Sequence, residues 1–336
     1  MTRAAIVGLG RWGRSLVTAV AGNSDDIRFV CAVTRTRTNG EAFCREKRIE
    51  LVDSYEQILR DPEIDAVVLA TPHSQHQAQA LAAIAANKHV FVEKPLTLDF
   101  ASARRVAGAA EKAGLVLAIG FTRRFHPSIA ELRARVRDGR LGKIIAMVAQ
   151  HTTSTAQFIP PDNWRAAPQE APGGAFTAVG VHALDHMIEF AGRVRDVRAV
   201  TARNYPGPSD DTTTIMLNFD SGATGLIFCS VATATNFQFI AYGSNGLAEI
   251  SRADLSRFRG APVATAAPTG LVAAPTDELL EFSGFDMLRA EMVAFGRAIS
   301  DGAPYPVPIA DVLHGMAVFD AVVESAKRGD VVAVAK

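Results

Sequence analysis

Lys88-His89-Val90-Phe91-Val92-Glu93-Lys94-Pro95 is the most informative segment of this 336-residue chain. Its β-branched and aromatic centre is typical of a buried strand, and the strand ends abruptly in a carboxylate, an amine and a proline. In open α/β sheets the ligand site lies beyond the carboxyl ends of the strands, so Glu93 and Lys94 are predicted to reach that site. The alternative for this pair is a solvated salt bridge at an ordinary strand end.

A glycine-rich turn lies near the start of the chain, between a predicted strand at 4–7 and a helical pattern at 15–21. In this G-x-G-x-x-G arrangement, Gly8 allows a tight turn, Gly10 a close approach of the backbone to a ligand, and Gly13 packing of helix on strand. Free N–H groups and the helix dipole favour a pyrophosphate there. Arg11 and Trp12, inside the motif, are predicted cofactor contacts too. A turn without a ligand is the alternative.

The end of the second predicted strand, residues 28–33, indicates which dinucleotide is bound. An NAD-specific chain usually places Asp or Glu there, on the ribose 2′-hydroxyl, whereas this chain has Thr34-Arg35-Thr36-Arg37. A guanidinium and hydroxyls can bind a 2′-phosphate through charge-assisted hydrogen bonds. We therefore predict binding at Thr34 and Arg35 and a preference for NADP(H) over NAD(H). The alternative is a pair of solvated arginines.

Strands and helices then alternate as a doubly wound parallel sheet requires. The predicted strands are 49–52, 64–70, 90–92 and 115–119, and the predicted helices are 55–60, 77–86 and 99–113. Six parallel strands complete a first domain at residues 1–121. The loop Thr71-Pro72-His73-Ser74-Gln75-His76 follows one of these strands, so Thr71, Pro72, His73 and His76 either contact the cofactor or only cap the next helix.

The second half, residues 122–336, is predicted to form an α/β domain with a large open, mainly antiparallel sheet. Its predicted strands are 143–151, 194–203, 212–218, 223–231 and 237–243, and its predicted helices are 127–138, 176–192, 285–300 and 309–327. Residues 158–172 and 261–275 are expected to be loops. An open sheet with apolar residues on both faces needs cover, so we expect a homo-oligomer, a dimer or tetramer.

Composition excludes several classes of protein. Thirty-five basic and 35 acidic residues cancel, so no overall field favours nucleic acid or an anionic membrane. No run reaches the roughly 18 apolar residues of a membrane span. Three scattered cysteines, at 31, 44 and 229, have no metal or disulfide spacing. We expect a soluble cytoplasmic protein with a small-molecule substrate and no metal.

The order of the motifs resembles that of the Gfo/Idh/MocA family, named for glucose-fructose oxidoreductase and inositol dehydrogenase. The resemblance rests on G-x-G-x-x-G, Thr-Pro-x-x-x-His, Glu-Lys-Pro, Gly-Phe-x-Arg-Arg-Phe at 120–125, Asn163-Trp164-Arg165, Gly173-Gly174, Gly180-x-His182 and Asp185. It implies a Rossmann domain followed by a sheet domain often used for oligomerisation. It also implies an NAD(P)-dependent oxidoreductase acting on CH–OH groups of a sugar, cyclitol or dihydrodiol.

The same resemblance assigns the site residues. Lys94 lies beside the nicotinamide and His182 transfers a proton, while substrate contacts are expected at Lys94, Arg123, Trp164, Arg165, His182 and Asp185. Arg123 and Glu93 are also expected near the cofactor. Asp185 follows His182 by three residues on one helix face and could fix its tautomer. A core histidine with a satisfied hydrogen bond is the rival interpretation of His182.

One position departs from the family pattern. The usual Asp-x-Gly-x-His carries an aspartate four residues before the histidine, and here that residue is Ala178. The missing carboxylate puts a standard sugar substrate in doubt. It also keeps open a non-catalytic NAD(P)-binding sensor of the same fold, although retention of Lys94 and His182 favours an enzyme.

Overall fold

The computed structural model describes residues 1–160, 163–264 and 276–336, so most of the loop predicted at 261–275 lies outside the described residues. Two compact units are present. The first contains residues 1–125 and 286–316, and the second contains residues 126–285 and 317–336. Residues 286–316 thus cluster with residues 1–125, although residues 126–285 of the second unit separate them in sequence.

The first unit is built on a six-stranded parallel sheet, as predicted, and its strand order is β3-β2-β1-β4-β5-β6. Its strands are β1 Thr2–Val7, β2 Ile27–Val33, β3 Glu50–Leu51, β4 Ala66–Leu69, β5 His89–Glu93 and β6 Leu117–Gly120. Its helices are α1 Arg11–Val20, α2 Arg37–Lys47, α3 Tyr55–Arg60, α4 His76–Ala85, α5 Phe100–Ala113 and α8 Met287–Ser300, with the first part of α9 Ile309–Arg328.

The central strands of this sheet are covered on both faces, which explains their continuous apolar sequence. All four residues of β4 are buried, and Phe91 of β5 is fully buried. The Phe91 ring contacts Phe295 of α8, with ring centroids 5.7 Å apart. The local ends follow the capping rules, since Asp99 accepts from the Ser102 N–H at 2.7 Å and Gly114 ends α5 with φ of +66°.

The second unit is built on a nine-stranded sheet with the order β14-β13-β12-β11-β7-β10-β9-β8-β15. Its strands are β7 Ile144–Thr152, β8 Val194–Ala202, β9 Thr212–Phe219, β10 Thr224–Ser230, β11 Asn236–Gly243, β12 Gly246–Ser251, β13 Arg257–Pro262, β14 Glu278–Glu281 and β15 Val332–Ala333. Only the β7–β10 pair is parallel among the described pairs of this sheet, which confirms the predicted mainly antiparallel arrangement.

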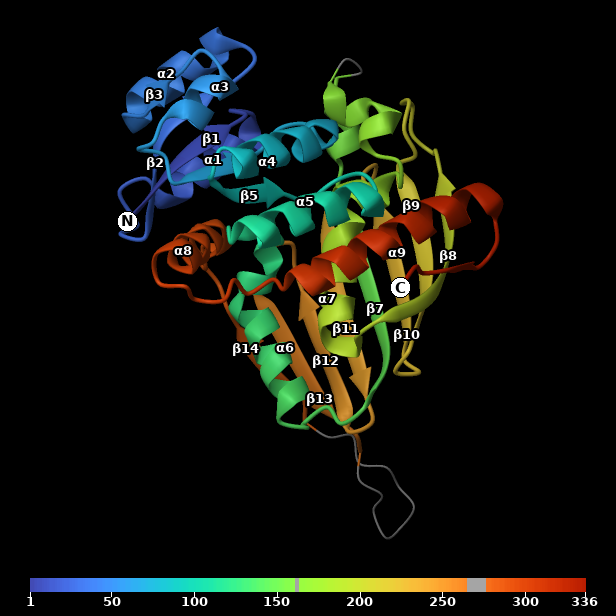
Figure 1. The fold of residues 1–336 in the computed structure, drawn as a ribbon. Coiled ribbons are helices and arrows are strands. Elements are labelled where there is room, and N and C mark those ends of the chain that lie inside the picture. The colour runs from blue at the N-terminus through green and yellow to red at the C-terminus, as the bar shows by residue number, and fades with distance from the viewer. Residues whose placement is uncertain (161–162, 265–275) are drawn as a thin grey trace, which may run out of the picture. The chain divides into compact units, whose positions relative to one another are not determined.

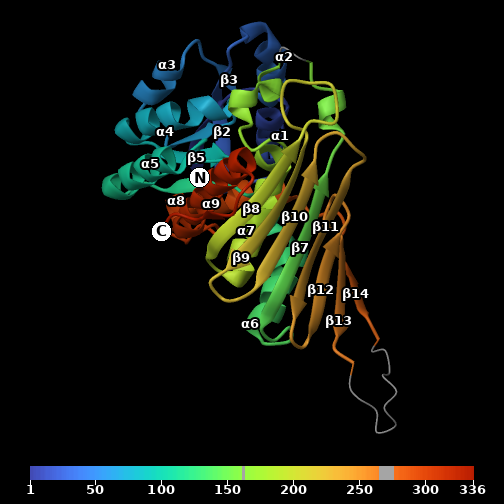
Figure 2. The same cartoon turned by 90° about the vertical axis from the view of Figure 1, so that its right-hand side faces the viewer.

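Helices cover one face of this sheet. Helices α6 Pro127–Arg137 and α7 Val181–Ala191 pack against β12 and β7 (Figures 1 and 2). Alternate residues of the strands are buried against them, for example Ile215 and Leu217 of β9. The intervening residues, such as Met216, point to the opposite face. Two-residue alternation of this kind is the pattern of a sheet with one covered face.

Several sequence predictions need correction. Helix α2 was not predicted at all, nor were strands β12, β13 and β14, and β13 extends to Pro262 inside the predicted loop. The helix predicted at 176–192 is two elements, a π-helical turn at Phe176–Gly180 followed by α7. Helix α1 begins at Arg11, four residues earlier than predicted.

No helix in the described part of the chain is long and apolar enough to cross a membrane.

Candidate active site

The glycine turn after β1 has three glycines with three different reasons for lacking a side chain. Gly8 has φ of +99°, and a Cβ there would lie 2.6 Å from the Ala70 carbonyl oxygen. A Cβ at Gly13 would collide with the Gly8 carbonyl oxygen. A Cβ at Gly10, by contrast, would meet nothing within 4 Å. Gly8 and Gly13 are therefore required by the chain's own packing, whereas Gly10 leaves open space for a ligand.

The first turn of α1 complements this space. Gly10 is the N-cap residue and provides no side-chain hydrogen bond, and the first turn carries no acidic residue. The backbone N–H groups at this end, together with the positive end of the helix dipole, form a position that suits a phosphate. These residues fit the pyrophosphate of a dinucleotide.

The end of β2 carries the residues predicted to select the cofactor. Thr34 is half-buried and Arg35 is exposed. Arg37 is instead the first residue of α2, where its guanidinium pairs with the carboxylate of Asp53 and lies 3.6 Å from Glu41. Of the two arginines in this segment, Arg35 is the one whose charge is not engaged by those carboxylates.

His76 connects the loops that follow β4 and β5. Its ring is fully buried, with Nδ1 2.9 Å from the Pro95 carbonyl oxygen and Nε2 3.1 Å from the Thr71 carbonyl oxygen. The Thr71 hydroxyl in turn hydrogen-bonds the Gln79 side chain at 2.6 Å. This geometry supports the alternative in which His76 holds the loop, and His73, in the short helix His73–Gln75, stacks edge-on against its ring at 5.7 Å.

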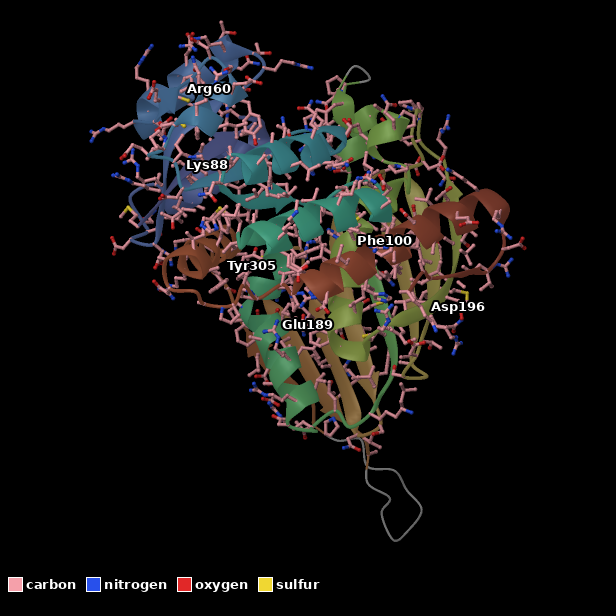
Figure 3. The ribbon with its side chains drawn as sticks, viewed as in Figure 1. Arg60, Lys88, Phe100, Glu189, Asp196 and Tyr305 are labelled. Atoms are coloured by element: carbon pink, nitrogen blue, oxygen red, sulfur yellow. The ribbon has the colours of Figure 1, made fainter. Side chains whose placement is uncertain are left out.

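Strand β5 is fixed at both ends by polar contacts. At its start, the Lys88 ammonium donates to the carbonyl oxygens of Asp61 and Ile64 at 2.6 and 2.7 Å (Lys88 is labelled in Figure 3). At its end, the buried Glu93 carboxylate accepts from the indole Nε1–H of Trp12 at 2.5 Å. Lys94 follows at the half-buried strand tip. The sheet thus delivers an amine and a carboxylate to its carboxyl edge, as the sequence indicated.

The segment after β6 carries two arginines in different surroundings. Burial lowers the pKa of the Arg123 guanidinium to about 10, which leaves it charged at neutral pH. Arg124 is buried and pairs with Asp311 at 3.1 Å. The Tyr305 hydroxyl donates to the Ile119 carbonyl oxygen at 3.1 Å (Figure 3). Tyr305 and Asp311 were not predicted, because nothing in the sequence near residue 120 indicates contacts from 186 residues away.

In the second unit, His182 is buried in the first turn of α7. His151 is the penultimate residue of β7 and was not among the predicted site residues. Its ring lies beside that of His182, with ring centroids 6.3 Å apart. Nδ1 of His151 donates to the Val179 carbonyl oxygen at 3.1 Å, because a carbonyl oxygen only accepts. His151 was missed, although its place at the end of a predicted strand was a usable signal.

Asp185 and the residues around it are also buried. Its carboxylate lies 3.9 Å from Nδ1 of His186, the next residue along α7. The Glu189 carboxylate, labelled in Figure 3, pairs with Arg133 at 2.5 Å and lies 4.0 Å from the same His186 nitrogen. The carboxylate of Asp185 is therefore close to a second histidine of α7, which the sequence interpretation did not consider.

The remaining residues of interest lie on short elements. Ala178 is in the π-helical turn, a kind of turn that is frequent at functional sites. Trp164 and Arg165 form part of the short helix Trp164–Ala166, where the guanidinium lies 4.2 Å from the centroid of the indole ring. The side chain of Asn163 caps this helix by accepting from the Arg165 N–H at 3.0 Å.

The parallel sheet, the open glycine turn and the polar carboxyl edge define a class, the dinucleotide-binding proteins of Rossmann fold. Residues 2–121 match the family described as "Oxidoreductase family, NAD-binding Rossmann fold", and residues 129–249 match the "GFO/IDH/MocA C-terminal domain". The chain belongs to the Gfo/Idh/MocA family of oxidoreductases. The predicted family and fold class are confirmed.

Individual relatives are more distant. The chain is 27% identical over 223 residues to trans-1,2-dihydrobenzene-1,2-diol dehydrogenase of Oryctolagus cuniculus, covering 66% of each chain. It is 32% identical over 240 residues to scyllo-inositol 2-dehydrogenase (NAD(+)) of Bacillus subtilis, covering 66% of this chain and 65% of that one. The chain thus matches just under two thirds of the length of these relatives. A solved structure of levoglucosan dehydrogenase with NADH and levoglucosan has a TM-score of 0.88 and 20% identity, covers 100% of both chains, and shows the same fold.

Proposed function

We propose that this protein is an NADP(H)-dependent oxidoreductase that transfers a hydride to or from a carbinol or carbonyl carbon of a small polyhydroxylated or cyclic molecule. One observation carries the proposal: the glycine turn with open space at Gly10 is hydrogen-bonded, through Trp12, to the carboxylate that precedes Lys94. This hydrogen bond joins the proposed dinucleotide site and the proposed reactive amine within one unit. The relatives named for a dihydrodiol and for scyllo-inositol support these substrate classes.

The preference for NADP(H) is supported by the end of β2. Arg35 is exposed there and follows Thr34, in the position where an acid would contact a 2′-hydroxyl. A 2′-phosphate would gain a charge-assisted bond from this guanidinium. Fluorescence titration of NADPH and NADH should give a lower Kd for NADPH, and Arg35→Ala should remove the difference. Equal binding of both cofactors by the unaltered protein would contradict the preference.

Bound nicotinamide supplies the site that accepts or donates the hydride. In the proposed mechanism the Lys94 ammonium hydrogen-bonds the reacting oxygen of the substrate and stabilises its developing negative charge. His182 takes or returns the hydroxyl proton. Arg123, charged at neutral pH, is proposed to bind a substrate or cofactor oxygen, and Trp164, Arg165 and Asp185 to contact the substrate.

Ala178 offers no side-chain carboxylate to His182. A methyl group accepts no hydrogen bond, so it cannot raise the basicity of the imidazole as the usual aspartate would. The nearby ring of His151, whose tautomer is fixed by the Val179 carbonyl oxygen, is a polar group that remains beside His182. We therefore expect proton transfer to depend on His182 with no carboxylate from position 178.

The test is turnover with a panel of cyclitols, anhydrosugars, dihydrodiols and simple ketones, followed by absorbance of the reduced nicotinamide. With any substrate that turns over, Lys94→Ala should reduce kcat by about 10²–10⁴-fold while cofactor Kd changes little. Lys112→Ala, on the exposed last turn of α5, is the matched control and should keep the kcat and the cofactor Kd of the wild type. Wild-type turnover by Lys94→Ala would reject the catalytic assignment.

A non-catalytic sensor is the second candidate, and Ala178 is the observation that favours it. A sensor would bind NADP(H) and yet turn over no compound of the panel, and Lys94→Ala would then leave cofactor binding intact. Turnover of any panel compound that depends on Lys94 rejects this alternative.

We also propose that the protein self-associates through the open face of the nine-stranded sheet. The strand registers place Met216, Leu226, Val148 and Ile240 in one row across four adjacent strands. Met216 and Leu226 are 60% and 39% exposed, and the row continues into Glu249. An apolar row of this length on the surface is a common mark of a protein interface.

A cytoplasmic location is proposed on the state of the cysteines. Cys31, Cys44 and Cys229 are all buried free thiols. Burial raises the pKa of the Cys31 and Cys229 thiols to about 12, so neither is poised for oxidation or exchange. Unreactive reduced thiols of this kind are usual in a reducing compartment.

A further inference from the structure

The two residues on either side of Lys94 are each held by a different loop of the first unit. Glu93 accepts a hydrogen bond from Trp12, which lies inside the glycine motif, and the Pro95 carbonyl oxygen faces Nδ1 of His76, which ends the Thr-Pro-x-x-x-His loop. These partners are 81 and 19 residues away in sequence. The contacts join three segments that each end at the same edge of the sheet.

On the Glu93 side, the carboxylate lies between the Trp12 indole and Gly120. An indole can only donate, and Glu93 is buried, so this hydrogen bond stabilises a charge that is otherwise costly to bury. Gly120 lies beside it on the next strand, where a Cβ would be 2.9 to 3.1 Å from the carboxylate atoms. The carboxylate therefore fills the space that a side chain at Gly120 would need, and it cannot move without losing Trp12.

On the Pro95 side, His76 faces carbonyl oxygens with both ring nitrogens. The Thr71 carbonyl oxygen is 3.1 Å from Nε2, and the ring itself is fully buried. Both oxygens are acceptors, so the ring donates to one of them in either neutral tautomer and remains in contact with the other. The backbone after Lys94 is thus tied to the backbone at the start of the cofactor loop.

We propose that Trp12 and His76 are positioning residues that clamp Lys94 between them and align its amine when a dinucleotide occupies the glycine turn. The proposal rests on the proposed function, since it takes Lys94 as the group that acts on the substrate. One contact holds the side chain before Lys94 and the other the backbone carbonyl after it, so both restrain the position of Lys94. Misplacement of a reacting group by about 1 Å can cost about 10²-fold in rate, so the two contacts have a measurable consequence.

Trp12→Phe and His76→Gln are the test variants, because the first removes the indole donor while keeping an aromatic ring and the second keeps one donor nitrogen in place of two ring nitrogens. Tyr55→Phe is the matched control. It removes one side-chain hydrogen bond of the same unit, the 2.7 Å bond to the Gln79 carbonyl oxygen, and contacts neither Glu93 nor Pro95.

Two readouts are needed. The first is steady-state kinetics with the best compound of the panel at saturating NADPH, where each test variant should lose about 10–100-fold in kcat while KM for the substrate changes by less than about threefold. The second needs no substrate. It is the rate at which trinitrobenzenesulfonate labels Lys94, measured by peptide mass spectrometry against Lys112 in the same sample and expected to change by about threefold or more in each variant.

The double variant separates a clamp from two independent losses. If both residues hold one lysine, Trp12→Phe combined with His76→Gln should lose clearly less in kcat than the product of the single losses. Labelling and kcat equal to those of Tyr55→Phe in both single variants would overturn the proposal. A lowered melting temperature would reveal a variant that fails to fold, and the other variant then decides.

Failure of the proposed function is recognised separately. Wild-type protein that binds no NADPH and turns over no panel compound would reject the oxidoreductase, whereas the labelling comparison still reports whether Trp12 and His76 hold Lys94.

Discussion

Gly10→Ala should separate folding from cofactor binding. Gly10 has φ of −67° and ψ of −178°, a conformation that any residue adopts, and a Cβ there meets nothing within 4 Å. The substitution therefore strains neither the backbone nor the packing. Alanine also restricts the unfolded chain, so the free energy of unfolding should rise by about 0.4–1 kcal/mol or remain unchanged.

Binding should change in the opposite direction. The new methyl group projects about 1.5 Å from Cα into the space in which a pyrophosphate would approach the backbone. Overpacking by a methyl group typically costs about 1–3 kcal/mol. If this destabilisation affects only the complex with NADPH, it weakens the Kd of NADPH by about 5–150-fold.

The assay is NADPH titration by fluorescence and urea denaturation of the same preparations. Gly108→Ala, within α5 and also with open space at its Cβ, is the control and should leave Kd unchanged. A Gly10→Ala protein that is stable and binds NADPH as tightly as the wild type would refute the assignment of the open space to the dinucleotide.

Three further predictions concern His89, Gly120 and Leu226. Burial lowers the pKa of His89, whose Nδ1 accepts a backbone N–H at 2.9 Å, so the unfolded chain binds the proton more readily than the folded chain. The free energy of unfolding should therefore be full above about pH 6.5 and fall as the pH drops through the folded pKa. His89→Gln should reduce this loss in urea denaturation at about pH 7 and pH 5. An unchanged pH dependence in that variant would contradict the prediction. Gly120→Ala should destabilise by about 1–3 kcal/mol and lower kcat because its Cβ displaces Glu93, while Gly108→Ala, which gains helix propensity, should not; equal melting temperatures would count against it. Leu226→Glu should dissociate the proposed oligomer to the 35.8 kDa chain in sedimentation, and a wild-type protein that is already monomeric at micromolar concentration would exclude the interface.

The first unit was largely predictable because its central strands are buried on both faces. A short continuous apolar run such as that of β5, rich in β-branched and aromatic residues and followed by Pro95, is typical of a buried strand. Helix α2 was missed for the opposite reason. Only Gly40 and Cys44 of its eleven residues are buried, so the sequence carries almost no apolar periodicity there.

The site was predictable residue by residue, but its contacts were not. Motifs identified Trp12 and Glu93 separately as cofactor contacts, whereas their mutual hydrogen bond spans 81 residues and leaves no local pattern. The same is true of Tyr305, which contacts β6, and of Asp311, which contacts Arg124 just after β6. Sequence periodicity reports which face of an element is buried, and it does not report the partner.

The return of residues 286–316 to the first unit has a consequence for synthesis of the chain. When residues 1–125 have emerged from the ribosome, all six parallel strands have been synthesised. Phe91 still lacks its ring contact with Phe295, and the Thr2 hydroxyl still lacks its acceptor, the Gly296 carbonyl oxygen. Such long sequence separations raise the contact order and slow folding. The nascent sheet must therefore expose apolar surface until almost the whole second unit has emerged, and chaperone dependence should be concentrated in that interval.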